Sequence, residues 1–330
     1  MNREQYAAML KDISETHKAG GDTAACIAKY NERYKFMYIY NDNVFKILFG
    51  SPENEKITID FLNAVLGFIG SDCINNLAYI NPALPDAFGK SITSDIVATD
   101  QRLDRIVLEV QHIEDDSYNA RLVLYTAKHT IASRIKGEDY ALQNLNLISL
   151  QMFDGFPNSP NYRHSIRFKN QENEEFYDKQ TITLVEIPKF LKGNFATDNS
   201  RIAEWLRVID GLNNETPVAV PEGSPFALLQ EKAQLSIFTE EFLVSEAMKM
   251  SDHKYELYVE KKHARKEGLE EGRAEGRAEG RAKGLTEGAD AKAREMAAAM
   301  LADGDSVEKV VRISKLPESD VLAIKASLKK

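Results

Sequence analysis

The chain has 330 residues, 43% of them hydrophobic and 28% charged, proportions typical of a folded globular protein. Acidic residues outnumber basic ones by 51 to 42, and the net charge of −9 argues against a generally basic nucleic-acid binder, although it leaves room for a local basic groove. No apolar run approaches the ~20 residues that span a membrane and the first residues carry no signal-peptide core, so we expect a cytoplasmic protein with no membrane partner.

Several common types of site are missing from the sequence. Cys26 and Cys73 are the only cysteines, and they give neither a disulfide framework nor zinc-ligand spacing, which fits a reducing cytoplasm. The six histidines show no ligand spacing, so we expect His112 and His129 to be structural or exposed. No glycine-rich nucleotide loop and no nucleophile elbow is present.

Helical patterns come first along the chain. Residues 1–35 are polar and weakly periodic, and an amphipathic helix is predicted at residues 55–68. Between them, residues 41–50 open with helix-capping residues and end on a glycine, which predicts a further helix. A short strand is predicted at residues 74–80, before two prolines interrupt the chain.

The most informative segment follows these prolines, where apolar and polar residues alternate on both sides of a short polar break. A period of two on each arm predicts a β-hairpin. If residues 101–103 form the loop, closed by Asp100 against Asp104, the register places Asp95 directly opposite Glu109.

Asp95 and Glu109 are the candidate ligands of a metal ion. Cross-strand neighbours have Cβ atoms roughly 4.5–5.5 Å apart, and like charges that face each other destabilise a sheet. A hard divalent cation would relieve this, because magnesium typically binds one or two carboxylates together with a substrate phosphate. The alternative is a solvent-facing hairpin with two unrelated acids. Gln111 shares the face of Glu109, either as part of the site or as an ordinary polar strand residue.

The rest of the chain divides into a mixed part and a helical part. A helix is predicted after the hairpin, followed by three strands, and this order indicates an α/β core of about 150 residues. The pattern then becomes helical to about residue 260. The helix is predicted at residues 118–136 and the strands at residues 145–153, 164–168 and 181–187.

Glycine recurs every fourth residue from Gly268 to Gly288, within Glu-Gly-Arg-Ala repeats. Each glycine inside a helix costs roughly 0.5–1 kcal/mol relative to alanine, and like charges meet at i,i+4. An isolated helix would be marginal, so the repeat either packs against another helix or acts as a tether. The final forty residues predict a helical hairpin, with a capping box at Asp305 and Glu308 and a last helix from Pro317. This hairpin is either a small packing or oligomerisation module or a DNA-reading helix-turn-helix.

An ordered set of short motifs runs through the first half of the chain. They are Asp42-x-x-Phe45-Lys46-x-x-Phe49-Gly50, Phe61-Leu62-Asn63, Asp95, Glu109-Val110-Gln111 and Arg121-x-x-x-Tyr125. Together they resemble the Rpn-type recombination-promoting nucleases, which are transposase-like members of the PD-(D/E)xK nuclease superfamily. The resemblance covers about residues 38–190, and the repeat and the helical tail look like the usual C-terminus of such proteins.

The resemblance implies an α/β fold with a PD-(D/E)xK nuclease-like core, in which helices flank a mixed four-stranded sheet, and an α-helical C-terminal extension. The sequence patterns and the resemblance together predict a helical lead-in at residues 1–37, the nuclease-like core at 38–190, a helical region at 191–262, the repeat as a helix or tether at 263–290 and the helical hairpin at 291–330.

The resemblance also assigns site residues. Asp95, Glu109 and Gln111 would be catalytic, and the two carboxylates with the Val110 carbonyl would hold Mg²⁺, or Mn²⁺ in its place. Gln111 stands where most relatives carry lysine. Glutamine can orient a water molecule but supplies no positive charge, so the metal would carry more of the chemistry.

Candidate accessory residues come from two helices. Asp42 would reach the metal from the side, or it caps its helix. Lys46 and Arg121 would contact phosphate, although Lys46 could equally be a solvated charge. Tyr118 and Tyr125 share a helix face with Arg121 by i, i+3, i+7 spacing and are expected to pack.

The function implied is that of a metal-dependent DNA endonuclease, transposase-like and recombination-promoting, with DNA as its partner. The alternative is a catalytically degenerate nuclease fold that binds DNA or assembles as a homo-oligomer through its C-terminal helices.

Overall fold

The computed structural model describes residues 1–81, 83–84, 92–114, 117–135, 137, 140–193, 195, 197–251, 273, 276–277, 280–281, 283–284 and 288–328. The chain divides into two compact units, Met1–Met250 and Ser251–Lys330. The domain boundaries expected from the sequence within these units stay predictions. Across the described residues, no helix is long and apolar enough to span a bilayer.

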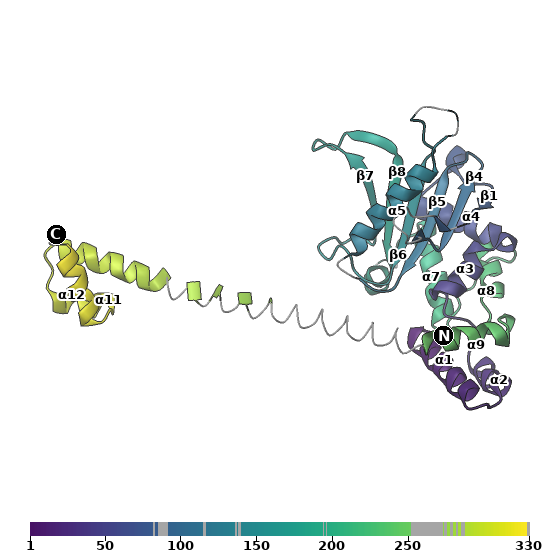
Figure 1. Ribbon diagram of the computed structural model, residues 1–330, viewed down its shortest axis with the longest axis horizontal. Coiled ribbons are helices and arrows are strands. Elements are labelled where there is room, and N and C mark those ends of the chain that lie inside the picture. The colour runs from purple at the N-terminus through teal and green to yellow at the C-terminus, as the bar shows by residue number, and fades with distance from the viewer. Residues whose placement is uncertain are drawn as a thin grey trace. The chain divides into compact units, whose positions relative to one another are not determined.

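The first unit is a sheet with helices around it (Figure 1). Its helices are α1 (Arg3–Lys18), α2 (Thr23–Arg33), α3 (Asp42–Gly50), α4 (Glu55–Leu66), α5 (Tyr118–Ala132), α6 (Ile187–Lys192), α7 (Arg201–Asn213), α8 (Pro225–Lys232) and α9 (Glu240–Met250). Its strands are β1 (Leu77–Tyr79), β2 (Ala83–Leu84), β3 (Ile92–Thr93), β4 (Ile96–Asp100), β5 (Arg105–Gln111), β6 (Leu145–Gln151), β7 (Arg163–Lys169) and β8 (Glu175–Glu186).

Six strands form the main sheet, in the order β1-β4-β5-β6-β8-β7. β5 pairs in parallel with β6, and β6 in parallel with β8, whereas the other neighbours are antiparallel. The sheet is therefore mixed, with the four central strands that the resemblance implies and one further strand at each edge. β2 and β3 form a separate two-stranded sheet.

Alternation along β5 sends its side chains into two different cores. Ile106, Leu108 and Val110 pack into the larger core together with residues of α3, α4 and α7. Val107 faces the opposite side, where Leu122 of α5 covers the sheet (Figure 1). The hairpin is consequently held from both faces, which fixes the direction of every side chain along it.

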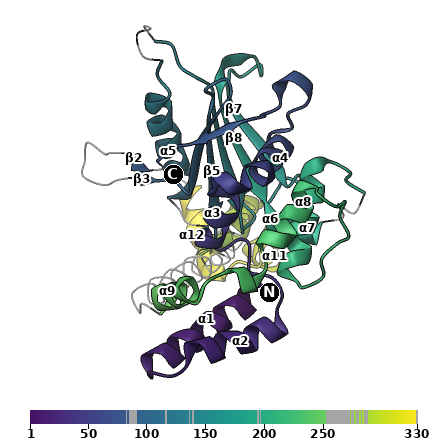
Figure 2. The same ribbon diagram turned by 90° about the vertical axis from the view of Figure 1, so that its right-hand side faces the viewer.

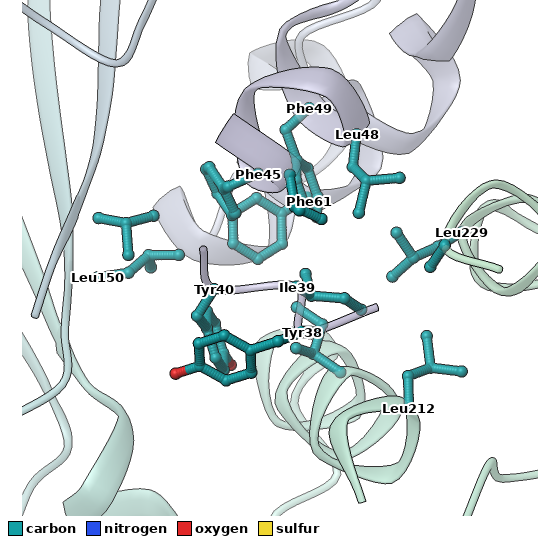
Figure 3. Packing of buried hydrophobic residues seen from close by; sticks show 14 of the residues in the cluster. Tyr38, Ile39, Tyr40, Phe45, Leu48, Phe49, Phe61, Leu150, Leu212 and Leu229 are labelled. Carbon is teal, nitrogen blue, oxygen red and sulfur yellow. The ribbon is translucent and has the colours of Figure 1, made fainter. Parts of the chain in front are cut away.

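An aromatic cluster anchors α3 to the larger core (Figure 3). The rings of Phe45 and Phe49 stack with centroids 4.5 Å apart, and Phe61 of α4 lies 5.0 Å from Phe49. Trp205 of α7 meets Phe61 edge-on at 5.5 Å. Because these side chains are completely buried, α3 forms a firm support for the residues on its other face.

The N-terminal helices belong to the same unit. α1, α2 and α9 lie side by side (Figure 2), and Met9, Ile13 and Leu243 join the larger core. Residues 1–37 therefore pack as part of the first unit, together with helices that come two hundred residues later.

The second unit is a small helical cluster. Residues 288–302 are helical, and α11 (Val307–Ser314) and α12 (Glu318–Ser327) follow. Ser306, not Asp305, caps α11, because its hydroxyl accepts the Lys309 amide; the predicted capping box is wrong. The acidic residues Glu318 and Asp320 occupy the first turn of α12, and the role of this helical hairpin stays a prediction. Most of the glycine repeat lies outside the described residues.

Candidate active site

The hairpin has the predicted register. Pairs run from Ile96 opposite Leu108 to Thr99 opposite Arg105, and continuing this register places residue 95 across from residue 109. The loop ends at Leu103 with φ +66°, the left-handed conformation that closes many loops of this length.

Asp95 itself differs from the prediction, because it does not lie within a strand. It occupies a bend directly before β4. Its Oδ2 accepts the Val110 amide at 2.9 Å, the donor that a continuous strand would have bonded through its backbone. The Asp95 carboxylate thus takes the place of a backbone hydrogen bond between the two strands. The predicted first strand is divided at this point into β3 and β4.

α3 brings Lys46 to the site. Lys46 Nζ lies 3.0 Å from Asp95 Oδ1, and the two side chains are 37% and 14% exposed. Asp42 lies one turn earlier, and its charge raises the pKa of both Asp95 and Lys46. The alternative role predicted for Asp42 is wrong, because Asn41 is the N-cap and accepts the amides of the first turn.

Glu109 is the most electrostatically unfavourable group of the site. Burial and the neighbouring Asp95 charge raise its pKa to about 8, against the opposing effects of the Ser94 hydroxyl, the Asp95 amide and Lys46. Burial likewise raises the pKa of Asp95, although the Val110 amide and Lys46 counteract it. Among the described residues, Glu109 Oε1 is buried without a hydrogen-bond partner. Two partly buried carboxylates with raised pKa values are therefore poised to accept a cation.

The Val110 carbonyl faces the same side. In an extended strand the N–H and C=O of one residue point in the same direction, and the Val110 N–H points to Asp95. Gln111 points the other way, because its carbonyl accepts the Met152 amide of the neighbouring segment. The role predicted for the Val110 carbonyl as a metal ligand stays a prediction.

The Gln111 side chain is already engaged on one side. Its Nε2 donates to the Ile113 carbonyl at 2.7 Å. This bond fixes the amide plane and leaves Oε1 as the atom that would accept a water proton. The role predicted for Gln111 stays a prediction.

α5 lines the site from the other face of the hairpin. Tyr118 is buried, and its hydroxyl hydrogen-bonds Ser149 Oγ at 2.6 Å. Tyr125 packs at the edge of the same core, so both tyrosines pack as predicted. Burial, followed by the Glu109 charge, raises the pKa of Tyr125, whereas Arg121 lowers it. Tyr125 therefore lies within the electrostatic field of the carboxylates and of Arg121.

Sequence reasoning assigned no role at the site to several residues next to it, although it expected His112 and His129 to be structural or exposed. His112 Nε2 lies 3.3 Å from Asp42 Oδ1 and 2.6 Å from the Tyr40 carbonyl, so this histidine ties α3 to the end of β5. Ser94 and His129 form a second contact beneath the carboxylates. Neither has a motif of its own, and only the position of Ser94 next to Asp95 offered a signal.

The donor set fits a hard divalent ion. In the part of the chain that the structure describes, no group of three or more His, Cys, Asp or Glu side chains is arranged around a common point. Asp95, Glu109 and the Val110 carbonyl supply oxygen ligands only, and the unpartnered Glu109 Oε1 leaves one of them open. Magnesium accepts this, because it usually keeps several waters and few protein ligands.

Comparison with known proteins identifies the family of this chain. Searches of curated proteins and of solved structures gave no match. The sequence model of one family, described as "PD-(D/E)XK nuclease family transposase", matches residues 39–271. The matched range contains α3, the hairpin and α5, and it extends well beyond the segment that carries the motifs. The chain therefore belongs to the PD-(D/E)XK nuclease family of transposases.

Proposed function

We propose that this protein is a metal-dependent DNA endonuclease that hydrolyses phosphodiester bonds and promotes recombination. The observation that carries the proposal is the pair of Asp95 and Glu109, two partly buried carboxylates on neighbouring segments with raised pKa values and one oxygen without a hydrogen-bond partner among the described residues. A structural pair of acids would be expected to have all its oxygens hydrogen-bonded.

Asp95, Glu109 and the Val110 carbonyl would hold a divalent ion, Mg²⁺ or Mn²⁺. Such an ion supplies Lewis-acid stabilisation of phosphate and a lowered pKa for a bound water. Gln111 Oε1 orients the attacking water by accepting a hydrogen bond from it. Arg121 binds the phosphate from the side of α5.

Lys46 supplies the positive charge that Gln111 cannot. Its ammonium group lies 3.0 Å from Asp95, so it reaches the position where a scissile phosphate would meet the carboxylates. Burial lowers the pKa of Lys46, but Asp95, Asp42 and Glu109 raise it overall. Lys46 therefore stays charged at neutral pH and stabilises negative charge that develops on the phosphate.

The test is cleavage of supercoiled plasmid DNA by purified protein in Mg²⁺. Wild type is expected to nick the plasmid, and Asp95→Asn or Glu109→Gln to abolish nicking while circular dichroism shows a folded chain. Glu172→Gln, which changes an exposed acid in the β7–β8 turn, is the matched control and should cut like wild type. Equal cutting by Asp95→Asn and wild type would refute the proposal.

The second candidate is a degenerate nuclease fold that acts as a binding or assembly module. The net charge of −9 and the glutamine at position 111 favour it. Calorimetric titration distinguishes the two, because a degenerate site should bind neither Mg²⁺ nor Mn²⁺ at millimolar concentration, whereas the proposed nuclease should bind both.

A further inference from the structure

A chain of buried polar groups runs beneath the carboxylates. Ser94 Oγ lies 3.0 Å from His129 Nε2, and His129 Nδ1 lies 3.4 Å from Arg105 Nη1. Ser94 and His129 are completely buried and Arg105 is 9% exposed. The three residues come from the bend before β4, from α5 and from the start of β5, so only the folded chain brings them together.

The donors and acceptors of these groups determine the direction of each hydrogen bond between them. Arginine has donors only, so His129 Nδ1 must accept from Arg105. Burial and the Arg105 charge lower the pKa of His129 to about 4, so the ring is neutral at physiological pH. A neutral imidazole has one acceptor and one donor, and the proton therefore resides on Nε2 and is donated to Ser94 Oγ.

Ser94 connects these hydrogen bonds to the active site. Because its oxygen accepts from His129, its own proton is free to be donated to a different acceptor. The Ser94 hydroxyl lowers the pKa of the Glu109 carboxyl, as a donor facing it would, while Glu109 Oε1 keeps no hydrogen-bond partner among the described residues. One side of the carboxylate is thus restrained and the other is left open.

We propose that Arg105, His129 and Ser94 form a positioning chain that orients the Glu109 carboxylate toward the metal. The inference rests on the proposed function, since it assigns Glu109 as a ligand. The three residues are positioning residues and do not touch the substrate. Hydrogen-bonded partners of metal ligands commonly matter in this way, and losing one typically weakens metal affinity or activity 10–100-fold.

The first experiment tests the direction of the chain without any metal. The ¹⁵N-detected spectra of the histidine rings in the full-length protein are assigned with His129→Gln, and the His129 signals should show the proton on Nε2. A proton on Nδ1 would overturn the positioning chain whatever the protein binds.

The second experiment measures Mn²⁺ affinity by calorimetry. Ser94→Ala is expected to weaken binding about 10–100-fold. His129→Gln, whose amide can still donate to Ser94, should stay within about threefold of wild type, and so should Thr126→Val, which removes another buried hydroxyl of α5.

The outcomes separate the two claims. If wild type binds no Mn²⁺, the proposed function fails and the metal role of the chain fails with it. If wild type binds Mn²⁺ and Ser94→Ala binds it equally well, only the positioning chain fails. A Ser94→Ala variant that does not fold is replaced by Ser94→Cys, which keeps a weak donor and should lie between wild type and the loss expected for alanine.

Discussion

The hairpin carries a pair of acids at each end, and the two pairs are treated very differently. At the turn, Asp100 accepts the amides of Arg102 and Asp104 at 2.8 and 2.9 Å, together with Arg102 Nε at 2.8 Å. Asp104 accepts the Asn144 side chain at 2.8 Å. At the open end, Asp95 receives one amide and one lysine, and one oxygen of Glu109 receives nothing among the described groups.

The contrast shows how a fold distinguishes structural acids from acids available for chemistry. The turn surrounds its carboxylates with donors, and each charge-assisted hydrogen bond contributes roughly 1.5–3 kcal/mol. The open end partly buries its carboxylates and gives them fewer donors, and burial raises their pKa values. Stability is thus concentrated at the turn, and the capacity to bind a cation at the open end.

The difference between the two ends is tested most directly by neutralising one acid at each end of the hairpin. Asp95→Asn should lower DNA cleavage at least ~1,000-fold, about 4 kcal/mol in the barrier, because it removes a proposed ligand, while the stability changes little. Asp100→Asn should do the reverse and cost about 2–3 kcal/mol of unfolding free energy with cleavage preserved. Urea unfolding and plasmid nicking measure the two quantities. If Asp100→Asn lost both cleavage and metal binding as Asp95→Asn does, the proposed division between the two ends of the hairpin would be contradicted.

Acid should destabilise the open end through His129. Its pKa is lowered to about 4 in the fold, so the unfolded chain takes up the proton first. The contribution of neutral His129 to the free energy of unfolding is therefore complete above pH 6.5. It is lost as the pH falls from 6.5 toward 4, by roughly 3 kcal/mol at most. Urea unfolding at pH 7 and pH 4.5 measures it. The same change in pH should cost His129→Gln less, and an identical loss would remove His129 as the cause.

Neutralising Glu109 should stabilise the protein. Its raised pKa means that the ionised form opposes folding, with a cost that grows as the pH rises from 4.5 toward 8. Glu109→Gln should therefore gain roughly 1–3 kcal/mol at pH 8, whereas Asp104→Asn at the turn should lose stability. Thermal unfolding at pH 8 compares them, and a destabilised Glu109→Gln variant would show that the carboxylate is needed structurally.

The smallest effect is expected at Lys46. Lys46→Met shortens the unbranched side chain by one atom and removes the charge next to Asp95. Cleavage should fall about tenfold, the value of one charged contact of ~1.4 kcal/mol. Metal should bind somewhat more tightly, because a competing cation is gone. Lys56→Met on the exposed side of α4 is the matched control, and tighter metal binding in both variants would exclude a local effect.

The sequence predicted the hairpin well because local rules determine it. Alternation on both arms and a short polar loop fix the register, so the residue pattern by itself places Asp95 and Glu109 opposite each other. The contact of Lys46 with Asp95, by contrast, depends on how α3 packs on the sheet, and no periodicity encodes it. Ser94 and His129 are joined in the same way, through the position of α5.

Other differences also have physical causes. β8 begins at Glu175, six residues before the prediction, because residues 175–180 have no buried face and therefore show no clear alternation. The choice of Asn41 over Asp42 as the cap of α3 turns on a shift of one residue, which a run of three capping residues leaves open.

One leucine at the tip of the hairpin is a suitable position for a stabilising substitution. Leu103 holds a backbone conformation that glycine adopts freely, and 62% of its side chain faces water. A β-carbon in that conformation costs on the order of 1 kcal/mol, and the apolar side chain recovers little from burial. Leu103→Gly would therefore relax the tip while leaving the acids at the far end of both strands unchanged, which would give a sturdier parent in which to study damaging changes at the catalytic end.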